Sequence, residues 1–134
     1  KIDFLVNNIN TKVYTDSKWL EFIINQIISN SIKYQNKKTK SIIKISTYEK
    51  DAKIILEIYD NGIGISASDL PQVFDKTFTG LNGRSNAKST GMGLFIAKKL
   101  CEKLGHKIEI ESKKNQFTKV IITFSKNKFY EVVK

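Results

Sequence analysis

Two kinds of hydrophobic pattern run along this chain, one typical of helices and one typical of strands. Residues 17–34 carry apolar side chains at helical spacing, and Thr15 and Asp16 in front of them are good N-caps. The expected apolar stripe of this helix comprises Leu20, Ile24, Ile27 or Ile28, and Ser31. A second long helix is predicted over residues 91–104, closed by Gly105 as its C-cap.

Shorter apolar segments, bounded by turn residues, predict strands. They cover residues 2–6, 42–48, 53–59, 107–112 and 118–124, with a further short strand expected at Val13–Tyr14. Because the connections at 49–52 and 113–117 are short, each is expected to close an antiparallel hairpin. Residues 70–74 are expected to form one helical turn, with Pro71 near its start. The pattern predicts an α+β fold, a two-layer sandwich in which helices cover one face of a mixed, mostly antiparallel sheet.

The length of 134 residues fits a single domain over residues 1–134, which is large enough to bury a hydrophobic core. The single cysteine, Cys101, excludes an internal disulfide. No apolar run approaches the ~20 residues that a membrane-spanning helix needs. The chain begins at Lys1 and its only methionine is Met92, so we expect it to be a domain excised from a longer protein.

The net charge of +10 favours polyanionic partners, a class that includes nucleic acid, anionic lipid and nucleoside triphosphates. Charge alone does not choose among them. The lysines are spread over the whole chain without a dense arginine tract, so most of them are expected to lie on solvated surface. A basic nucleic-acid-binding domain is the alternative that the charge suggests, but no base-reading motif supports it.

Four polar residues share one face of the first predicted helix, beside its apolar stripe. They are Gln26, Asn30, Lys33 and Tyr34. A solvated helix face usually carries Glu and Lys, whereas Gln and Asn are neutral amides. The amide oxygen of Asn30 is a hard ligand suited to Mg²⁺, Lys33 can pair with a phosphate, and Tyr34 can lie against a purine ring. A plain solvated face remains the alternative.

A glycine motif, Asp-Asn-Gly-Ile-Gly-Ile, directly follows the strand predicted at 53–59. A carboxylate at a strand end such as Asp60, beside glycines that permit close approach, can accept a hydrogen bond from the exocyclic amine of adenine. It would repel the carbonyl oxygen that guanine presents at the same position. One alternative is a plain turn. The other is a dinucleotide-binding fingerprint formed by Gly62, Gly64 and Ala67, which needs a parallel strand–turn–helix unit that a hairpin does not provide.

Residues 75–90 are rich in Gly, Ser, Thr, Asn and Lys and contain few apolar anchors, which predicts a flexible lid. The sequence Ser-Thr-Gly-Met-Gly-Leu at 89–94 then opens the second helix. A glycine-rich helix start exposes backbone N–H groups to a polyphosphate, and Arg84 and Lys88 of the lid would add positive charge. The alternative is an ordinary glycine-containing helix start. A P-loop is excluded because its glycines are missing and no strand precedes it.

Taken in order, four motifs resemble the N, G1, F and G2 boxes of sensor histidine kinase catalytic domains, within the gyrase/Hsp90/histidine kinase/MutL ATPase superfamily. The motifs are Gln26-Ile-Ile-Ser-Asn30-Ser-Ile-Lys33-Tyr34, Asp60-Asn-Gly62-Ile-Gly64, Phe74-Asp-Lys-Thr-Phe78 and Ser89-Thr-Gly91-Met-Gly93-Leu94. Segments 13–20 and 78–84 further resemble the antimicrobial-peptide-sensing kinases of Gram-positive bacteria, which work beside ABC transporters. The resemblance covers nearly the whole chain and implies the Bergerat-type ATP-binding fold, with residues 75–90 as the ATP lid.

This resemblance implies a role in ATP binding or catalysis for each matching residue. The residues concerned are Gln26, Asn30, Lys33, Tyr34, Asp60, Gly62, Gly64, Phe74, Phe78, Arg84, Lys88, Thr90, Gly91, Gly93 and Leu94. Asn30 would bind Mg²⁺ and Lys33 a phosphate, while Asp60 would bind the adenine amine. Phe74 and Phe78 would anchor the lid when ATP is bound.

The residue one turn before the magnesium ligand separates kinases from ATPases in this superfamily. The hydrolysing members carry a glutamate there, whereas this chain has Gln26, a neutral amide that cannot take a proton from water. A histidine nucleophile needs no strong base, so positioning and electrostatic stabilisation of the phosphoryl group would suffice. The only histidine, His106, stands at the start of a predicted strand and is expected to be structural.

The implied function is transfer of the γ-phosphoryl group of Mg–ATP to a histidine on a separate dimerisation domain, as the catalytic part of a two-component sensor kinase. The implied cofactors are ATP and Mg²⁺, and the implied location is the cytoplasmic side of a cell-membrane protein. The implied partners are the phosphoacceptor histidine domain, a response regulator and, through the full-length protein, an ABC transporter. The isolated domain is expected to be monomeric, to bind no nucleic acid and not to phosphorylate itself. The alternative is a nucleotide-sensing binding module without phosphotransfer.

Overall fold

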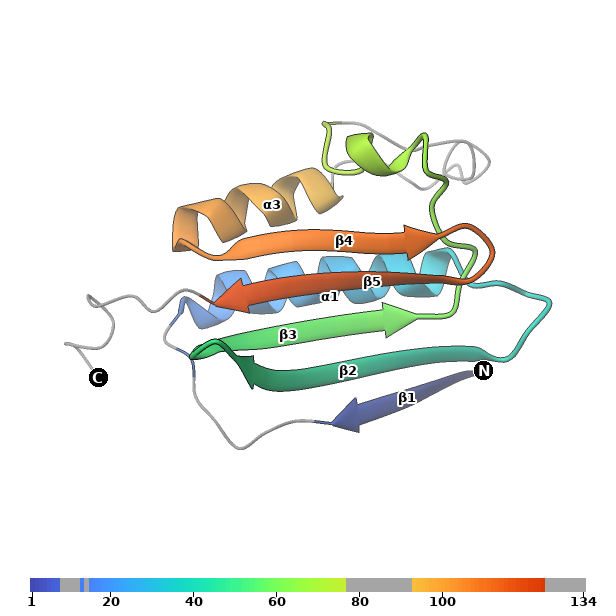
Figure 1. Cartoon of the computed structure of the whole chain (residues 1–134), viewed down its shortest axis with the longest axis horizontal. Helices are drawn as coiled ribbons and strands as arrows, with labels where there is room; N and C mark the ends of the chain where they lie inside the picture. Colours follow the sequence, from blue (N-terminus) through green and yellow to red (C-terminus); the bar gives the residue numbers. More distant parts are fainter. Residues whose placement is uncertain (8–12, 14, 77–92, 125–134) are drawn as a thin grey trace.

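The computed structural model describes residues 1–7, 13, 15–76 and 93–124 (Figure 1). Its elements are β1 (Ile2–Asn7), α1 (Ser17–Lys33), β2 (Ser41–Lys50), β3 (Lys53–Asp60), the 3₁₀ turn η1 (Leu70–Gln72), α3 (Gly93–Leu104), β4 (Lys107–Lys113) and β5 (Phe117–Phe124). The strands form one sheet in the order β1-β2-β3-β5-β4. The β1–β2 pair is parallel and the other pairs are antiparallel, so the predicted mixed, mostly antiparallel sheet is confirmed.

Helix α1 starts at the predicted cap but buries a different row of side chains from the expected stripe. Oδ1 of Asp16 accepts a hydrogen bond from the backbone N–H of Trp19 at 2.9 Å, which satisfies one of the free donors of the first turn. The buried row is Ile23, Ile27 and Ser31, while Leu20 and Ile24 only flank it. Because isoleucines occupy adjacent positions along this helix, the apolar arc is wide and the sequence does not fix its centre.

Three further predictions concern short elements and the start of α3. The strand expected at Val13–Tyr14 is wrong at Val13, which belongs to no strand and packs against the core, and Tyr14 lies outside the described residues. The helical turn expected at 70–74 is the 3₁₀ turn η1. Helix α3 is described from Gly93 onward, so the first two residues of the helix predicted at 91–104 lie outside the described residues.

The hydrophobic core lies between the sheet and the two helices, with α1 behind the sheet and α3 beside it in Figure 1. Its largest fully buried side chains are Ile23, Ile27, Ile43, Ile58, Ile122 and Cys101. Burial raises the pKa of the Cys101 thiol to about 11, so this thiol stays protonated at neutral pH. Among the described helices, none combines the length and the apolar character needed to cross a membrane.

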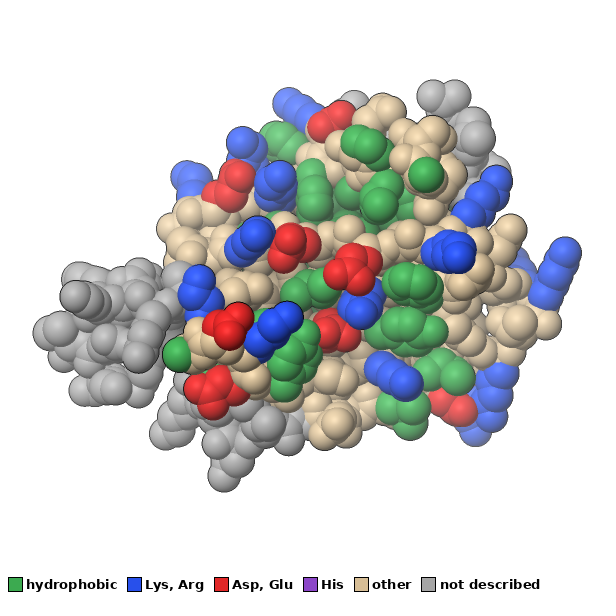
Figure 2. All heavy atoms as spheres, in the orientation of Figure 1, with side chains coloured by type: hydrophobic (Ala, Val, Ile, Leu, Met, Phe, Trp, Pro, Cys, Tyr) green, Lys and Arg blue, Asp and Glu red, His purple; other side chains and the backbone are tan. Residues whose placement is uncertain are grey.

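The opposite face of the sheet carries charged and hydrophobic side chains (Figure 2). Lys119 Nζ lies 3.8 Å from a carboxylate oxygen of Glu57 and 3.6 Å from one of Glu111. The rings of Tyr59 and Phe117 stack with their centroids 5.9 Å apart. Acidic and basic side chains are interspersed over the strands on this face, rather than forming a uniform basic surface. Among the described residues, this face does not show the clustered positive charge that is typical of a nucleic-acid-binding surface.

His106 is buried at the junction between α3 and β4, with only 5% of its surface exposed. Its Nε2 lies 2.8 Å from the hydroxyl oxygen of Thr15, and its ring meets the Phe124 ring edge-on at a centroid distance of 4.8 Å. Burial lowers the pKa of His106 below its usual value. This environment agrees with the structural role expected for His106.

Because the folded chain keeps His106 neutral, we expect the free energy of unfolding to decrease as the pH falls below about 6.5. The unfolded chain binds a proton near that pH and the folded chain does not, so acid favours unfolding. A single group contributes at most about 1.4 kcal/mol per pH unit. Chemical denaturation at several pH values would measure the slope, with His106→Gln as the comparison. Equal slopes in the two proteins would contradict the prediction.

Candidate functional site

Four segments that are far apart in the sequence lie between the middle of the molecule and its right-hand end in Figure 1. These are the C-terminal end of α1, the end of β3 with the glycine motif that follows it, the N-terminal end of α3, and the turn between β4 and β5. Most of the described residues of the predicted site lie on the first three of these segments. The fold therefore brings the polar stripe of α1, which consists of Gln26, Asn30, Lys33 and Tyr34, to the same side of the molecule as the glycine motif.

Asp60 is the last residue of β3, and its carboxylate is buried, with 7% of the residue exposed. Its Oδ1 accepts a hydrogen bond from the backbone N–H of Gly62 at 2.9 Å, and its Oδ2 accepts one from the hydroxyl of Ser31 at 2.7 Å. Burial raises the pKa of the Asp60 carboxyl, and these two hydrogen bonds act in the opposite direction. The carboxylate is thus held in one orientation and retains acceptor capacity for a further donor.

Gly62 packs the glycine motif directly against the end of α1. The backbone N–H of Ile63 donates to the carbonyl oxygen of Tyr34 at 3.0 Å. A Cβ atom on Gly62 would overlap that same carbonyl oxygen, so only glycine fits at this close approach. The contact fixes the distance between Asp60 and the helix that carries Asn30.

Gly64 is required on the other side of the motif, where the chain meets the β4–β5 turn. Its φ of +70° lies in the left-handed region, and a Cβ atom there would overlap the carbonyl oxygen of Lys113. The backbone N–H of Asn115 donates to the carbonyl of Ile63 at 2.6 Å, and that of Ile65 donates to the Ser112 hydroxyl at 2.8 Å. The turn thereby holds the motif in place.

Asn61 ties the motif to the start of β2. Its side-chain oxygen accepts from the backbone N–H of Ile42 at 2.8 Å, and its side-chain N–H donates to the carbonyl of Lys40 at 2.8 Å. A side chain that satisfies backbone groups in this way replaces part of the sheet ladder at the strand end. With α1 and the β4–β5 turn, β2 is the third element that clamps the motif.

The polar stripe of α1 lies along the side of the site that faces α3. A Cβ atom on Gly93, the first residue of α3, would overlap the side-chain oxygen of Gln26, so these two residues are in close contact. Asn30 is partly exposed, and its side chain makes no hydrogen bond to another described residue. Lys33 Nζ lies 5.7 Å from the centroid of the Tyr34 ring. All four side chains of the stripe are partly exposed rather than buried in the core.

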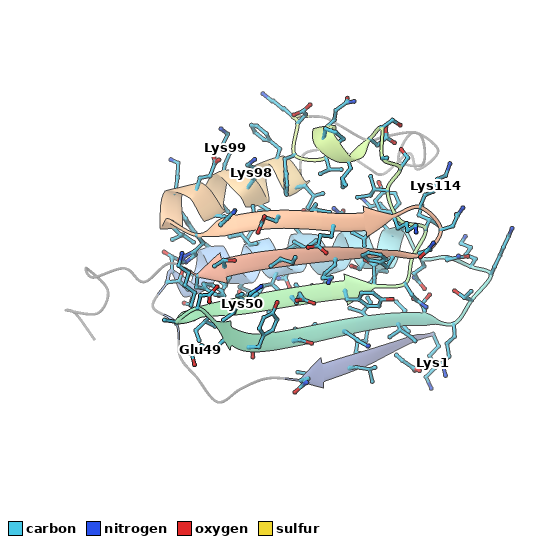
Figure 3. The ribbon with its side chains drawn as sticks, in the orientation of Figure 1. Lys1, Glu49, Lys50, Lys98, Lys99 and Lys114 are labelled. Atoms are coloured by element: carbon cyan, nitrogen blue, oxygen red, sulfur yellow. The ribbon has the colours of Figure 1, made fainter. Side chains whose placement is uncertain are left out.

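Phe74 lies between η1 and the predicted lid and packs against the core cluster. The ammonium group of Lys98 lies 5.0 Å from the centroid of its ring, a cation–π contact between the segment after η1 and α3. Figure 3 labels Lys98 on α3, on the side of the helix nearest η1. Leu94, the second residue of α3, is partly buried. The remaining predicted site residues, Phe78, Arg84, Lys88, Thr90 and Gly91, lie outside the described residues.

The chemistry of the site fits a magnesium ion bound together with a nucleotide. Within residues 1–7, 13, 15–76 and 93–124, no group of three or more His, Cys, Asp or Glu side chains could hold a metal ion. An ion at Asn30 would take its other ligands from phosphates and water, which is the usual mode of binding for Mg²⁺. The amide oxygen of Asn30 is a suitable protein ligand for that arrangement.

Comparison with known proteins identifies the family. Residues 15–128 match the family model described as "Histidine kinase-, DNA gyrase B-, and HSP90-like ATPase". The chain belongs to this ATPase family. The match includes α1, the glycine motif and the start of α3, and therefore every residue predicted for the site.

The relatives of this ATPase domain include sensor histidine kinases of Gram-positive bacteria. The chain is 37% identical over 113 residues to the sensor histidine kinase YxdK of Bacillus subtilis, covering 84% of the chain and 34% of the relative. It is 42% identical over 101 residues to GraS of Staphylococcus epidermidis, covering 75% of the chain and 28% of the relative. It is 38% identical over 123 residues to BceS of Bacillus subtilis, covering 91% of the chain and 36% of the relative. The chain spans about a third of the length of these relatives.

Solved structures with the same fold are also histidine kinases. The mycobacterial sensor histidine kinase MprB superposes with a TM-score of 0.81 at 23% identity, covering 92% of this chain and 82% of the other. The catalytic domain of the histidine kinase ThkA gives a TM-score of 0.76 at 24% identity, covering 93% and 79%. At these identities the likeness concerns the fold. It confirms the predicted architecture of the ATPase domain.

Three residues of the site were not predicted from the sequence. Ser31 was assigned to the apolar stripe of α1, although its hydroxyl binds Asp60. The sequence predicts no role for Asn61 beyond the alternative of a plain turn and none for Ser112 beyond a strand, although both satisfy backbone groups of neighbouring segments. The only sequence signal was a small polar residue at a position where the apolar stripe should continue. The partners of these residues are distant in the chain and are set by the tertiary fold.

Proposed function

We propose that this ATPase domain binds Mg–ATP and transfers the γ-phosphoryl group to a histidine on a separate domain, as the catalytic part of a two-component sensor kinase. The observation that carries the proposal is the buried carboxylate of Asp60, held by two hydrogen bonds at the end of β3 and beside Gly62. Family membership and the sensor histidine kinase relatives support the same function.

The carboxylate selects the base. Asp60 accepts hydrogen bonds and cannot donate them in its ionised form, so it pairs with the exocyclic amine of adenine and repels the carbonyl oxygen of guanine. The absence of a side chain at Gly62 allows the base to approach the strand end closely. The ring of Tyr34, at the end of α1, lines the adenine side of the site.

The phosphates bind along α1 and at the start of α3. Asn30 supplies a ligand to Mg²⁺, which bridges the phosphates, and Lys33 pairs with a phosphate oxygen. Gly91 and Gly93 bring backbone N–H groups to the polyphosphate at the positive end of the helix dipole, and Arg84 and Lys88 add charge from the lid.

Gln26 favours phosphotransfer over hydrolysis. Its side chain lies against Gly93, next to the phosphate side of the site, and it is a neutral amide. It cannot take a proton from water at neutral pH, whereas a neutral imidazole nucleophile needs no such base. The phosphoacceptor is not His106, because that side chain is buried on the core side of the junction between α3 and β4.

The partners of the full-length protein follow from this role. The domain acts on the phosphoacceptor histidine domain of the same kinase, which in turn phosphorylates a response regulator. In this proposal the full-length protein is held at the cell membrane, with this domain on the cytoplasmic side and an ABC transporter as a further partner. The isolated domain is monomeric.

The Asn30→Ala variant should lose the gain in ATP affinity that Mg²⁺ provides. Removal of the amide oxygen leaves the ion without its ligand from α1, and we expect the magnesium-dependent gain to shrink by about tenfold or more. Calorimetric titration of ATP with and without Mg²⁺ would measure it. Asn25→Ala, at an exposed position of the same helix, is the matched control. A magnesium effect of the same size in wild type and Asn30→Ala would contradict the assignment.

Phosphotransfer requires a second experiment, with the kinase's own phosphoacceptor domain added in trans. The isolated chain should bind ATP without labelling itself from γ-labelled ATP, and the added domain should gain a phosphohistidine. ATP binding without any transfer to that domain would instead support the alternative, a nucleotide-sensing module. Stable phosphohistidine on the isolated chain would overturn the claim that the acceptor lies on a separate domain.

A further inference from the structure

Ser31 is the polar member of the buried row on α1, four residues after Ile27, and only 5% of its surface is exposed. A hydroxyl in such surroundings costs free energy unless it is hydrogen-bonded. It donates to Oδ2 of Asp60 at 2.7 Å, and the described part of the chain contains no buried side-chain oxygen or nitrogen without a partner. The hydroxyl is therefore committed to the carboxylate that the proposed function uses.

The two hydrogen bonds to the Asp60 carboxylate come from different parts of the chain. The donor on Oδ1 is the backbone N–H of Gly62, two residues along the same loop, so this bond is local to the loop. The donor on Oδ2 comes from α1 and joins residues that are 29 positions apart. Only the second bond joins the carboxylate directly to a side chain of the helix. Ser31 also directly follows Asn30 in the sequence. The same helical turn therefore carries the residue that binds Asp60 and the residue proposed to bind Mg²⁺.

We propose that Ser31 is a specificity-determining positioning residue, whose hydroxyl holds the Asp60 carboxylate in the orientation that accepts the exocyclic amine of adenine. This inference rests on the proposed function of ATP binding. Ser31 acts through Asp60 and needs no contact with the nucleotide. A carboxylate held in this way cannot turn from the base, so its attraction for an amine and its repulsion of a carbonyl oxygen both increase.

The charge state of Asp60 supports the same role. Burial raises the pKa of its carboxyl, and the hydrogen bond from Ser31 is the first of the two groups that lower it again. Loss of the hydroxyl would make the carboxyl easier to protonate, and a protonated oxygen offers a hydrogen where the amine needs an acceptor.

The test compares two nucleotides that differ only in the amine. ATP and purine riboside triphosphate, which lacks the 6-amino group, would be titrated calorimetrically into wild type, Ser31→Ala and Ser31→Thr in the presence of Mg²⁺. We expect Ser31→Ala to weaken ATP binding by about three- to tenfold, the scale of one hydrogen bond, and to change binding of the other nucleotide by less than about twofold. Ser31→Thr, which keeps the hydroxyl, should restore most of the ATP affinity.

Ser29→Ala, at an exposed position on the same helix, is the matched control, and thermal unfolding of every variant shows which of them are folded. An equal loss for both nucleotides in Ser31→Ala would show a merely structural role and overturn the proposal. Unchanged ATP affinity in folded Ser31→Ala would overturn it too. Wild type that binds ATP no better than the nucleotide without the amine would overturn the role of Asp60 itself, and this outcome is visible before any variant is considered.

Discussion

Asp60→Asn is expected to weaken ATP binding by about 10- to 150-fold, which corresponds to the loss of a hydrogen bond to a charged group worth about 1.5–3 kcal/mol. The carboxylate accepts with both oxygens, whereas the amide presents two N–H donors on one side. In one orientation of the amide, these two donors face the adenine amine, which is itself a donor. In the other orientation they face the donors that bind the carboxylate in the wild type, the backbone N–H of Gly62 and the hydroxyl of Ser31. Calorimetric titration with Mg–ATP would measure the change.

The same variant should also lose its preference for ATP over GTP, because an amide can donate to the carbonyl oxygen of guanine. Asp51→Asn is the matched control, since it makes the same chemical change in the β2–β3 turn, at the opposite end of β3. Denaturation of each variant separates lost binding from lost folding. ATP affinity within about twofold of wild type in folded Asp60→Asn would remove the central residue of the proposed site.

Gly64→Ala is expected to lower the free energy of unfolding by about 2–5 kcal/mol, as the sum of two effects. A residue with a side chain resists the left-handed conformation at φ +70°, at a cost of about 1–2 kcal/mol. The new Cβ atom also overlaps the carbonyl oxygen of Lys113, and forced overlap of this kind typically costs about 1–3 kcal/mol. Chemical denaturation of the variant would measure the loss.

Gly105→Ala separates the two effects. Gly105 has a φ of +78° after the end of α3 and is exposed, so its replacement should show the conformational cost with less crowding. The variant of Gly64 should therefore lose more stability than the variant of Gly105. It should also bind ATP more weakly, because displacement of the loop from the β4–β5 turn moves Asp60. Equal losses of stability at the two glycines would show that the overlap at Gly64 is relieved easily.

Local patterns in the sequence predict much of the fold. The helix over 17–34, the two hairpins and the 3₁₀ turn with Pro71 each depend on neighbouring residues, through spacing, capping and short connections. The centre of the buried stripe on α1 was misplaced, because isoleucines at adjacent positions make several helix faces equally apolar. The strand expected at Val13 was also wrong, since an apolar residue packs against the core as readily from a loop.

The chemical groups that this protein offers follow from its sequence, namely the amides of the first helix, the carboxylate at the end of the second hairpin strand and the glycines beside it. How these groups are held follows from contacts in three dimensions. Ser31 reaches Asp60, Asn61 binds the start of β2, and Gln26 lies against Gly93, each through a contact between segments distant in the chain. Spacing along a chain fixes the face of a helix or strand, but the packing of the helices on the sheet sets the distances between elements. The orientation of the Asp60 carboxylate is therefore a property of the fold.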